Sequence, residues 1–493
     1  MTVKPRWWKK IYLVASVAAM AVATVLSMPA ALMAGEPLLG PFISEEDEAR
    51  IGAEQHDQIL AEFGGAYEDQ AVAAYVDSIG QFLALTSERP NVKFTFTVLN
   101  SPIVNAFALP GGYVYVTRGL LALAGDEAEL AGVIAHEIGH VAARRGAQRM
   151  SNTMLANLGI GLLGLLFDSE QIAGIAQMGA LAVIQSYSRE QEHEADSLGV
   201  NYLSRAGFDP EAMASFLGKL KAHSQLEAII AGQPSDGGGV DLLATHPRTA
   251  DRVRRAIEAA NMRPVANPIV GRGIYLKKID GMLYGDDPEQ GLVNGRVFLH
   301  PAMRFRFAAP ENFHIINGQT QVVAQGPDGA AFVFDLAARE SRQAMTDYIR
   351  RTWAPEVPLR GVEAIRINGF SAATALAEAT VGGQPSQVRL VAIEWDRSVI
   401  FRFMFFAPAN QGQRFDEDFR RTTYSFRSIS ASEAEAAKPR KLVLYRVRQG
   451  DTAGGIAKNF PGEKYPRERF LILNGWYPDE SLPRGMTVKT IRE

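Results

Sequence analysis

The sequence contains no cysteine. This absence excludes disulfide bonds, thiol nucleophiles, zinc sites built from thiolates and a lipidated N-terminal cysteine. An excess of charge of either sign is also missing, because 51 Lys and Arg residues face 54 Asp and Glu residues. A chain this close to neutrality does not indicate a nucleic-acid partner. What is present is ordinary for globular protein: 47% of the 493 residues are hydrophobic, which is enough for two or three domains.

The N-terminal segment, residues 1–34, has the pattern of an export signal. Basic residues in the first ten positions precede an uncharged, mostly apolar run from Ile11 to Ala34. The run ends in Pro29 and small residues, which favours a signal peptide cleaved after Ala34. The same run, residues 11–34, is long enough to stay as an uncleaved membrane anchor with its basic end inside. Both interpretations place the rest of the chain outside the cytoplasm.

A helix-forming run at residues 131–140 carries the strongest chemical signal. It reads Ala-Gly-Val-Ile-Ala-His-Glu-Ile-Gly-His and follows acidic residues suited to a helix N-terminus. His136 and His140 lie at positions i and i+4, on one face of the helix. Two imidazoles at this spacing can bind one Zn²⁺, and the adjacent Glu137 can reach a water bound to the metal. The plainer alternative is two helix histidines beside a surface glutamate, which fits poorly in so apolar a helix.

The residues before this helix predict a small sheet. Residues 93–99 and 113–117 alternate and are rich in β-branched and aromatic side chains, which is typical of strands. Zinc proteases commonly bind substrate as an added strand at such an edge, through backbone hydrogen bonds. We therefore expect a substrate-binding edge, the alternative being an ordinary hairpin, at Ala106, Phe107, Ala108, Leu109, Pro110 and Gly111.

A zinc site with an open position needs a third protein ligand. The acidic segment 187–196 opens a predicted helix, and its chemistry alone allows Glu190, Glu192, His193 or Glu194. Glu192 and Asp196 share a face at i and i+4. Glu192 could therefore bind the metal while Asp196 accepts a hydrogen bond from a ligating imidazole. A solvated acidic face is the alternative for this segment taken alone.

Taken in order, these motifs resemble family 48 of the metallopeptidases. That family holds the CAAX prenyl endopeptidases, the HtpX-type membrane proteases and the periplasmic BepA-like proteases. The resemblance covers about residues 40–260 and is carried by Asn105–Gly112, Ala135–His140, Ser188–Asp196 and the Thr-His-Pro-Arg-x-x-Asp-Arg motif at Thr245–Arg252.

The resemblance implies a mainly helical zincin fold of the gluzincin type with one zinc ion. It implies that Glu192 is the third ligand, beside His136 and His140, and that Glu137 is the general base. Asp196 then supports a ligand, and His246 lies near the site, where it assists the oxyanion or gates access to zinc. Convincing membrane spans around the site are missing, so the chain looks closer to the soluble periplasmic members.

The rest of the chain predicts an α+β multidomain protein. After the peptidase domain (35–260) comes a linker (261–296) rich in Pro and Asn at its start. Residues 297–430 alternate strand-like runs with two helical segments and show no site chemistry, so a scaffold or docking domain is expected. A second linker (431–441) leads to residues 442–493, which resemble a lysin-motif (LysM) domain: a strand, a Gly-Asp-Thr turn, two helices and a closing strand. Such modules bind N-acetylglucosamine-containing glycans, in bacteria usually peptidoglycan.

The sequence therefore predicts a zinc metalloendopeptidase of the bacterial periplasm. By analogy with the family, its substrates would be misfolded or misassembled envelope and outer-membrane proteins. Expected partners are these polypeptides, peptidoglycan through the last module, and a peripheral membrane or outer-membrane assembly surface. Two other functions stay open: a chaperone or adaptor whose zinc site is held latent by His246 or by the apolar residues 154–184, and a peptidoglycan-binding protein with little proteolysis.

Overall fold

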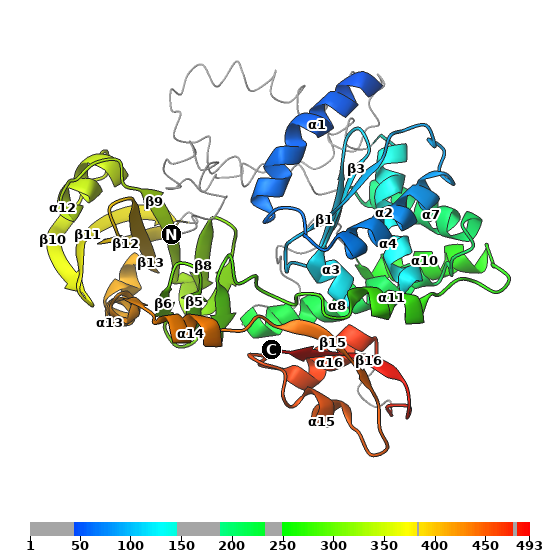
Figure 1. Ribbon diagram of the computed structural model, residues 1–493. Coiled ribbons are helices and arrows are strands. Elements are labelled where there is room, and N and C mark those ends of the chain that lie inside the picture. Colours follow the sequence, from blue (N-terminus) through cyan, green and yellow to red (C-terminus); the bar gives the residue numbers. More distant parts are fainter. Residues whose placement is uncertain (1–43, 145–187, 232–248, 382–383, 477–480) are drawn as a thin grey trace, which may run out of the picture.

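The computed structural model describes residues 44–144, 188–231, 249–381, 384–476 and 481–493. The export segment (1–34), the apolar region at 154–184 and His246 lie outside these residues. Within the described ranges, no helix combines the length and the apolar character that crossing a membrane requires. Helices and several separate sheets are present, so the predicted α+β multidomain organisation is confirmed (Figure 1).

The first group of elements is mainly helical and surrounds a small sheet. Both predicted strands are present, as β1 and β3, and the sheet has the order β1-β3-β2 with β1 parallel and β2 antiparallel to β3. The elements are α1 (Glu45–Glu62), α2 (Gln70–Ala84), β1 (Thr95–Leu99), β2 (Ala106–Leu109), β3 (Tyr113–Thr117), α3 (Arg118–Leu123), α4 (Glu127–Ala142), α7 (Arg189–Arg205), α8 (Ala212–Ala231) and α10 (Thr249–Asn261).

Helix α4 is the centre of this group. Its N-cap Asp126 accepts a hydrogen bond from Glu129 N, and every residue from Ala128 to Val141 is buried. A helix that is buried all round must be covered on several sides, and here α2, α7, α8 and β2 pack against it. Helix α7 comes closest, because Gly199 has no Cβ: an added Cβ would lie 3.1 Å from His136 N. The backbone of α7 is thereby brought next to the histidine-bearing turn of α4.

The segment 261–296, which the sequence predicts to be a linker, contains a helix packed into the core. Its middle forms α11 (Arg272–Ile279), whose Tyr275, Leu276 and Ile279 are buried in the same core as α4. The Tyr275 hydroxyl donates a hydrogen bond of 2.6 Å to Leu121 O. The Pro and Asn residues that indicated a loop lie before this helix, while its apolar face supplies the burial that holds it in place.

The middle group contains two antiparallel sheets. Their orders are β10-β11-β12-β13-β9-β8-β7 and β14-β6-β5-β4. Alternate residues of β13 point to one core, where Phe401, Phe403 and Phe405 pack with α13 and with Phe305 of β6. The elements are β4 (Leu292–Asn294), β5 (Val297–His300), β6 (Phe305–Ala308), β7 (His314–Asn317), β8 (Gln321–Gln325), η4 (Pro327–Gly329), β9 (Ala331–Ala338), α12 (Met345–Tyr348), η5 (Ile349–Trp353), β10 (Arg360–Ile367), β11 (Phe370–Val381), β12 (Gln384–Glu394), β13 (Val399–Pro408), η6 (Ala409–Gln411), α13 (Gly412–Ser425), β14 (Arg427–Ser428) and α14 (Ala431–Ala436).

The last group, residues 441–493, is called the C-terminal module below. It has the expected order of strand, two helices and strand: β15 (Lys441–Arg446), α15 (Ala453–Ala457), α16 (Pro466–Asn474) and β16 (Thr487–Arg492). The two strands form an antiparallel pair, and Gly450 adopts φ +86° in the turn that follows β15. The module lies against α8 of the first group and against α11 (Figure 1).

Candidate metal centre

Helix α4 presents its two histidines side by side in the protein interior. His136 and His140 are one turn apart, their ring centroids are 4.6 Å apart and both are buried. Their Nε2 atoms lie 3.0 Å from each other. The two nitrogens therefore point to a common position, as the i, i+4 spacing predicts.

Glu192 of α7 supplies a third donor at the same position. Ser188 starts α7 through a capping box with Gln191, which fixes the first turn that carries Glu192. The Glu192 oxygens lie 3.7 Å from His136 Nε2 and 3.4 Å from His140 Nε2. Donors bound to one tetrahedral zinc at about 2.0–2.1 Å are about 3.3 Å apart, so the donor set and its spacing fit zinc.

Asp196 lies one turn after Glu192 and contacts the other side of His136. Its Oδ1 is 2.9 Å from His136 Nδ1, a distance at which the imidazole Nδ1–H donates to the carboxylate. This hydrogen bond leaves Nε2 as the free lone pair for a metal. The structure thus brings Asp196 next to His136, while its role in metal binding stays a prediction.

Arg252 of α10 joins the two carboxylates of α7. Its Nε and Nη2 each donate to Asp196 at 2.8 Å, and its Nη1 lies 2.8 Å from Glu192 Oε2. The guanidinium is 3% exposed, so this is a buried ion-pair network. A buried carboxylate pair without such a cation would carry a large desolvation cost.

Burial and the charge of Arg252 shift the pKa values of the groups at this centre. Burial by itself would raise the pKa of Asp196, but the charge and hydrogen bonds of Arg252, together with His136, hold that pKa below its ordinary value of 3.8. Burial by itself would lower the pKa of His136, but the hydrogen bond to Asp196 together with the negative charges of Asp196 and Glu192 raises that pKa above its ordinary value. Because the pKa of Asp196 is depressed on folding, its ion pair stabilises the fold fully at neutral pH and is lost as pH falls below about 4.

Glu137 is a buried carboxylate on the same helix as the two histidines. It is fully buried and lies between the two ligand histidines in the sequence of α4, three residues before His140. Its charge is among those that raise the pKa of the Arg252 guanidinium. A carboxylate in this position can accept a proton from a water held beside the donor cluster.

In the part of the chain that the structure describes, strand β2 lies at one edge of the small sheet. It pairs with β3 on one side and packs against α4. Thr117 N donates to Asn105 O, so the alternation of an antiparallel pair turns the N–H and C=O groups of Ala106 and Ala108 away from β3. Gly111 closes the turn at φ +82°, where an added Cβ would lie 2.6 Å from Ala49 Cα of α1. Within the described residues β2 thus lies at one edge of the sheet with its turn held by α1, and the binding of substrate along it stays a prediction.

The other candidate ligands lie elsewhere. Glu190 and Glu194 are exposed on α7, and His193 Nε2 is 3.3 Å from Asp251 of α10. Within the described ranges, the group of His, Asp and Glu residues able to hold a metal consists of His136, His140 and Glu192. His246 lies outside the described residues, so its predicted role stays a prediction.

Sequence reasoning did not give Arg252 a role at the centre. A signal was available: Arg252 lies on the face of α10 that also carries Ala256 and Ala259, both buried. An arginine on the apolar face of an amphipathic helix indicates a buried carboxylate partner. Its partners could not be named, because they lie 56 to 60 residues earlier in the chain.

Comparison with known families identifies the kind of centre. The model described as Peptidase family M48 matches residues 70–260, a range that contains α4, α7 and α10. Residues 70–260 are called the M48 domain below, after the family that they match. The family uses zinc, and the M48 domain of this chain contains the buried donor group that fits zinc. The resemblance inferred from the sequence is thus confirmed for the M48 domain, while the lysin-motif resemblance stays a prediction.

Three curated relatives illustrate how far the likeness extends. The beta-barrel assembly-enhancing protease of Yersinia pestis is 34% identical over 261 residues, which cover 50% of this chain and 51% of the relative. The protein of that name in Escherichia coli (strain K12) is 34% identical over 207 residues, 40% of this chain and 41% of the relative. Mitochondrial metalloendopeptidase OMA1 of Schizosaccharomyces pombe is 28% identical over 219 residues, 44% of this chain and 62% of the relative. The chain spans about half the length of the curated relatives it matches.

Proposed function

We propose that this protein is a zinc-dependent metalloendopeptidase. The observation that carries the proposal is the buried group of His136, His140 and Glu192, whose donor atoms lie 3.0–3.7 Å apart beside Glu137. These three residues would hold the ion. Once bound, zinc would polarise the scissile carbonyl and make water a better nucleophile at neutral pH.

Three residues of the chain would supply the proton transfer and the support of the metal ligands. Glu137 takes a proton from the attacking water and delivers it to the leaving amine. Asp196 keeps His136 in the tautomer whose Nε2 faces the metal position, through the 2.9 Å contact at Nδ1. Arg252 holds Asp196 and Glu192 at a fixed spacing from a third helix.

Substrate would bind along β2. The N–H and C=O groups of Ala106 and Ala108 face away from β3, and a polypeptide added there would hydrogen-bond through its backbone. Such binding depends little on substrate sequence but requires an extended chain. Unfolded polypeptides therefore suit this edge better than folded domains.

The cellular setting is proposed from the N-terminal segment and from the relatives. The predicted export signal or anchor at residues 1–34 supports a periplasmic location for the M48 domain. Two of the similar proteins are named for enhancing β-barrel assembly. We propose that misfolded or misassembled envelope and outer-membrane proteins are the substrates of this protein.

Metal removal tests the proposed activity. We expect dialysis against a zinc chelator to lower the rate of casein cleavage at least 100-fold, because carbonyl polarisation is lost with the ion. Adding back one equivalent of Zn²⁺ should restore the rate. The measurement is the initial rate of release of labelled peptides, with zinc content determined by elemental analysis. Cleavage that persists in zinc-free protein would contradict the proposal.

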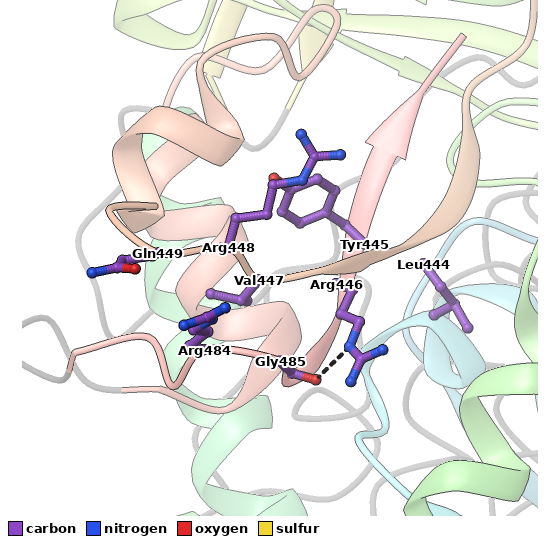
Figure 2. Close-up of a pocket in the computed structure, with 8 residues that line it drawn as sticks. All are labelled: Leu444, Tyr445, Arg446, Val447, Arg448, Gln449, Arg484 and Gly485. Carbon is purple, nitrogen blue, oxygen red and sulfur yellow. Dashed lines mark hydrogen bonds between the residues drawn. The ribbon is translucent and has the colours of Figure 1, made fainter.

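A second binding function is favoured by a cavity in the C-terminal module. The cavity has a volume of about 530 Å³ and lies between β15 and the turn before β16 (Figure 2). It is lined by Leu444, Tyr445, Arg446, Val447, Arg448, Gln449, Arg484 and Gly485.

The cavity is basic. Arg446 donates to Gly485 O, and Arg448 lies over the ring of Tyr445 (Figure 2). An aromatic ring beside three guanidinium groups, with the single carboxylate of Asp451 at the Tyr445 hydroxyl, suits a glycan that carries carboxylates. We infer that the module binds peptidoglycan, whose peptide stems supply such carboxylates.

Exchange of the three arginines tests this inference. We expect R446A/R448A/R484A to lower the fraction of protein that sediments with purified peptidoglycan about tenfold, because the anion contacts are lost. The exposed lysines Lys458 and Lys464 provide a matched control, and K458A/K464A should sediment like the wild type. Equal loss in both variants would indicate general charge attraction instead of a site.

A further inference from the structure

Lys489 of β16 is a fully buried lysine whose side chain reaches out of its own module. Its Nζ donates to the backbone oxygens of Ala122 (2.7 Å), Leu123 (3.2 Å) and Ala124 (2.7 Å). These carbonyls belong to the end of α3, where helical carbonyls have no partner inside the helix. A cation at that position also faces the negative end of the helix dipole. Lys489 therefore caps α3 from a strand more than 360 residues further along the chain.

The capped carbonyls lie at the corner from which α4 starts. Helix α3 ends at Leu123 and α4 begins at Glu127, so we call residues 122–129 the α3–α4 corner. Inside the corner, the buried Glu129 accepts hydrogen bonds from Gly125 N (2.7 Å), Ser215 Oγ (2.6 Å) and Lys219 Nζ (2.7 Å). The corner is thus held by polar contacts that come from outside α3 and α4.

A second contact ties the C-terminal module to the same corner. Arg272 of α11 donates to Gly125 O at 2.8 Å and to Thr487 O of β16 at 3.4 Å. Burial lowers the pKa of the Lys489 ammonium well below its ordinary value. Placing this amine in the interior therefore costs free energy, which the three carbonyl contacts at the corner offset.

Lys489 is itself fixed on both sides. Asn474 at the end of α16 accepts a hydrogen bond from Lys489 N (2.8 Å) and donates to Lys489 O (3.0 Å). On β15, the buried Leu442 belongs to the same hydrophobic core as α4 and exchanges backbone hydrogen bonds with residues 281 and 282. The module is therefore built into the peptidase core and is not merely tethered to it.

We propose that Lys489 is a positioning residue for the zinc site, through which the C-terminal module fixes the start of α4. The proposal rests on the zinc-dependent function proposed above. His136 lies ten residues after Asp126, about 15 Å along a stiff helix, so a change at the corner is carried to both histidines. Zinc ligation tolerates distance errors of only about 0.2 Å. A loosened corner should therefore weaken zinc binding while the packing of α4 on α7 preserves the fold.

The test compares K489M with K458M in the full chain. Met keeps the apolar length of the side chain but cannot donate to the carbonyls, and Lys458 is an exposed lysine of the same module. We expect K489M to bind zinc at least tenfold more weakly in competition with a chelator, and to lower kcat on casein with KM unchanged. The visible spectrum of the Co²⁺-loaded variant should also shift, because it reports ligand geometry. K458M should match the wild type in zinc affinity, in the kinetic constants on casein and in the Co²⁺ spectrum.

Wild-type zinc affinity and cobalt spectrum in folded K489M would overturn the proposal. If K489M does not fold, N474S, which frees the backbone of Lys489 without removing its charge, takes its place, and unchanged zinc affinity there is equally decisive. A wild-type protein that binds zinc tightly but cleaves nothing would refute the protease function alone. In that case the zinc affinity measured by competition with a chelator would still test the proposed role of Lys489.

Discussion

Replacing Glu137 by glutamine is expected to lower kcat on unfolded casein by about 10²–10⁴-fold, the usual contribution of a general base. The amide keeps the size of the side chain but cannot accept the proton of the attacking water. His136, His140 and Glu192 are untouched, so zinc content should stay at one ion per chain. The measurements are initial cleavage rates and elemental zinc on the same preparation.

Glu194→Gln is the matched control for this variant. Glu194 lies on α7 two residues after Glu192, but it is exposed, so its exchange should leave the rate within about twofold of the wild type. E137Q should still retain unfolded polypeptide, because binding along β2 uses backbone groups. Wild-type proteolysis by E137Q would mean that another group acts as the base.

Replacing Arg252 by methionine is expected to cause the largest loss of stability. Removing one partner of a buried ion pair costs about 3–5 kcal/mol, because the other charge stays buried without compensation. Here two carboxylates, Asp196 and Glu192, would lose their cation at once. The metal-free variant should therefore melt on the order of 10 °C below the metal-free wild type. Zinc should recover part of this loss, since its charge compensates Glu192.

Arg254→Met is the control for this prediction. Arg254 lies two residues further along α10 and pairs with Asp251 and Glu258, but its side chain is 59% exposed. Exposed pairs contribute about 0–1 kcal/mol, so the melting temperature should change little. Thermal melts of R252M and R254M, each with and without zinc, give four melting temperatures to compare with the wild type. Equal melting of R252M and R254M would show that Arg252 does not support the ligand carboxylates.

Local spacing explains how much of the centre could be predicted. Two histidines four residues apart share a helix face whatever packs around them, and Glu192 and Asp196 obey the same rule on α7. Residues alone left four candidates for the third ligand. The choice of Glu192 depended on a family resemblance, and the structure places Glu192 between the imidazoles because α7 packs on α4 at Gly199.

Contacts across long sequence separations could not be predicted. Arg252 reaches α7 only because α10 packs beside it, and no local pattern encodes that arrangement. The helix at Arg272–Ile279 was missed because Pro264 and Pro268 dominated the interpretation of its surroundings. Lys489 follows Val488 in a short strand, where alternation predicts a solvent-facing side chain. Its burial depends on an α3 terminus that lies in another part of the chain.

The two halves of the α3 cap are made at different times during translation. The carbonyl of Ala122 accepts a hydrogen bond from Lys489, which lies 367 residues later in the chain. At about 5–20 residues per second, the ribosome needs roughly 20–70 s to make that stretch. During this interval the histidine-bearing helix exists without its distant support. A nascent chain therefore carries His136, Glu137, His140 and Glu192 well before it carries the lysine that caps α3.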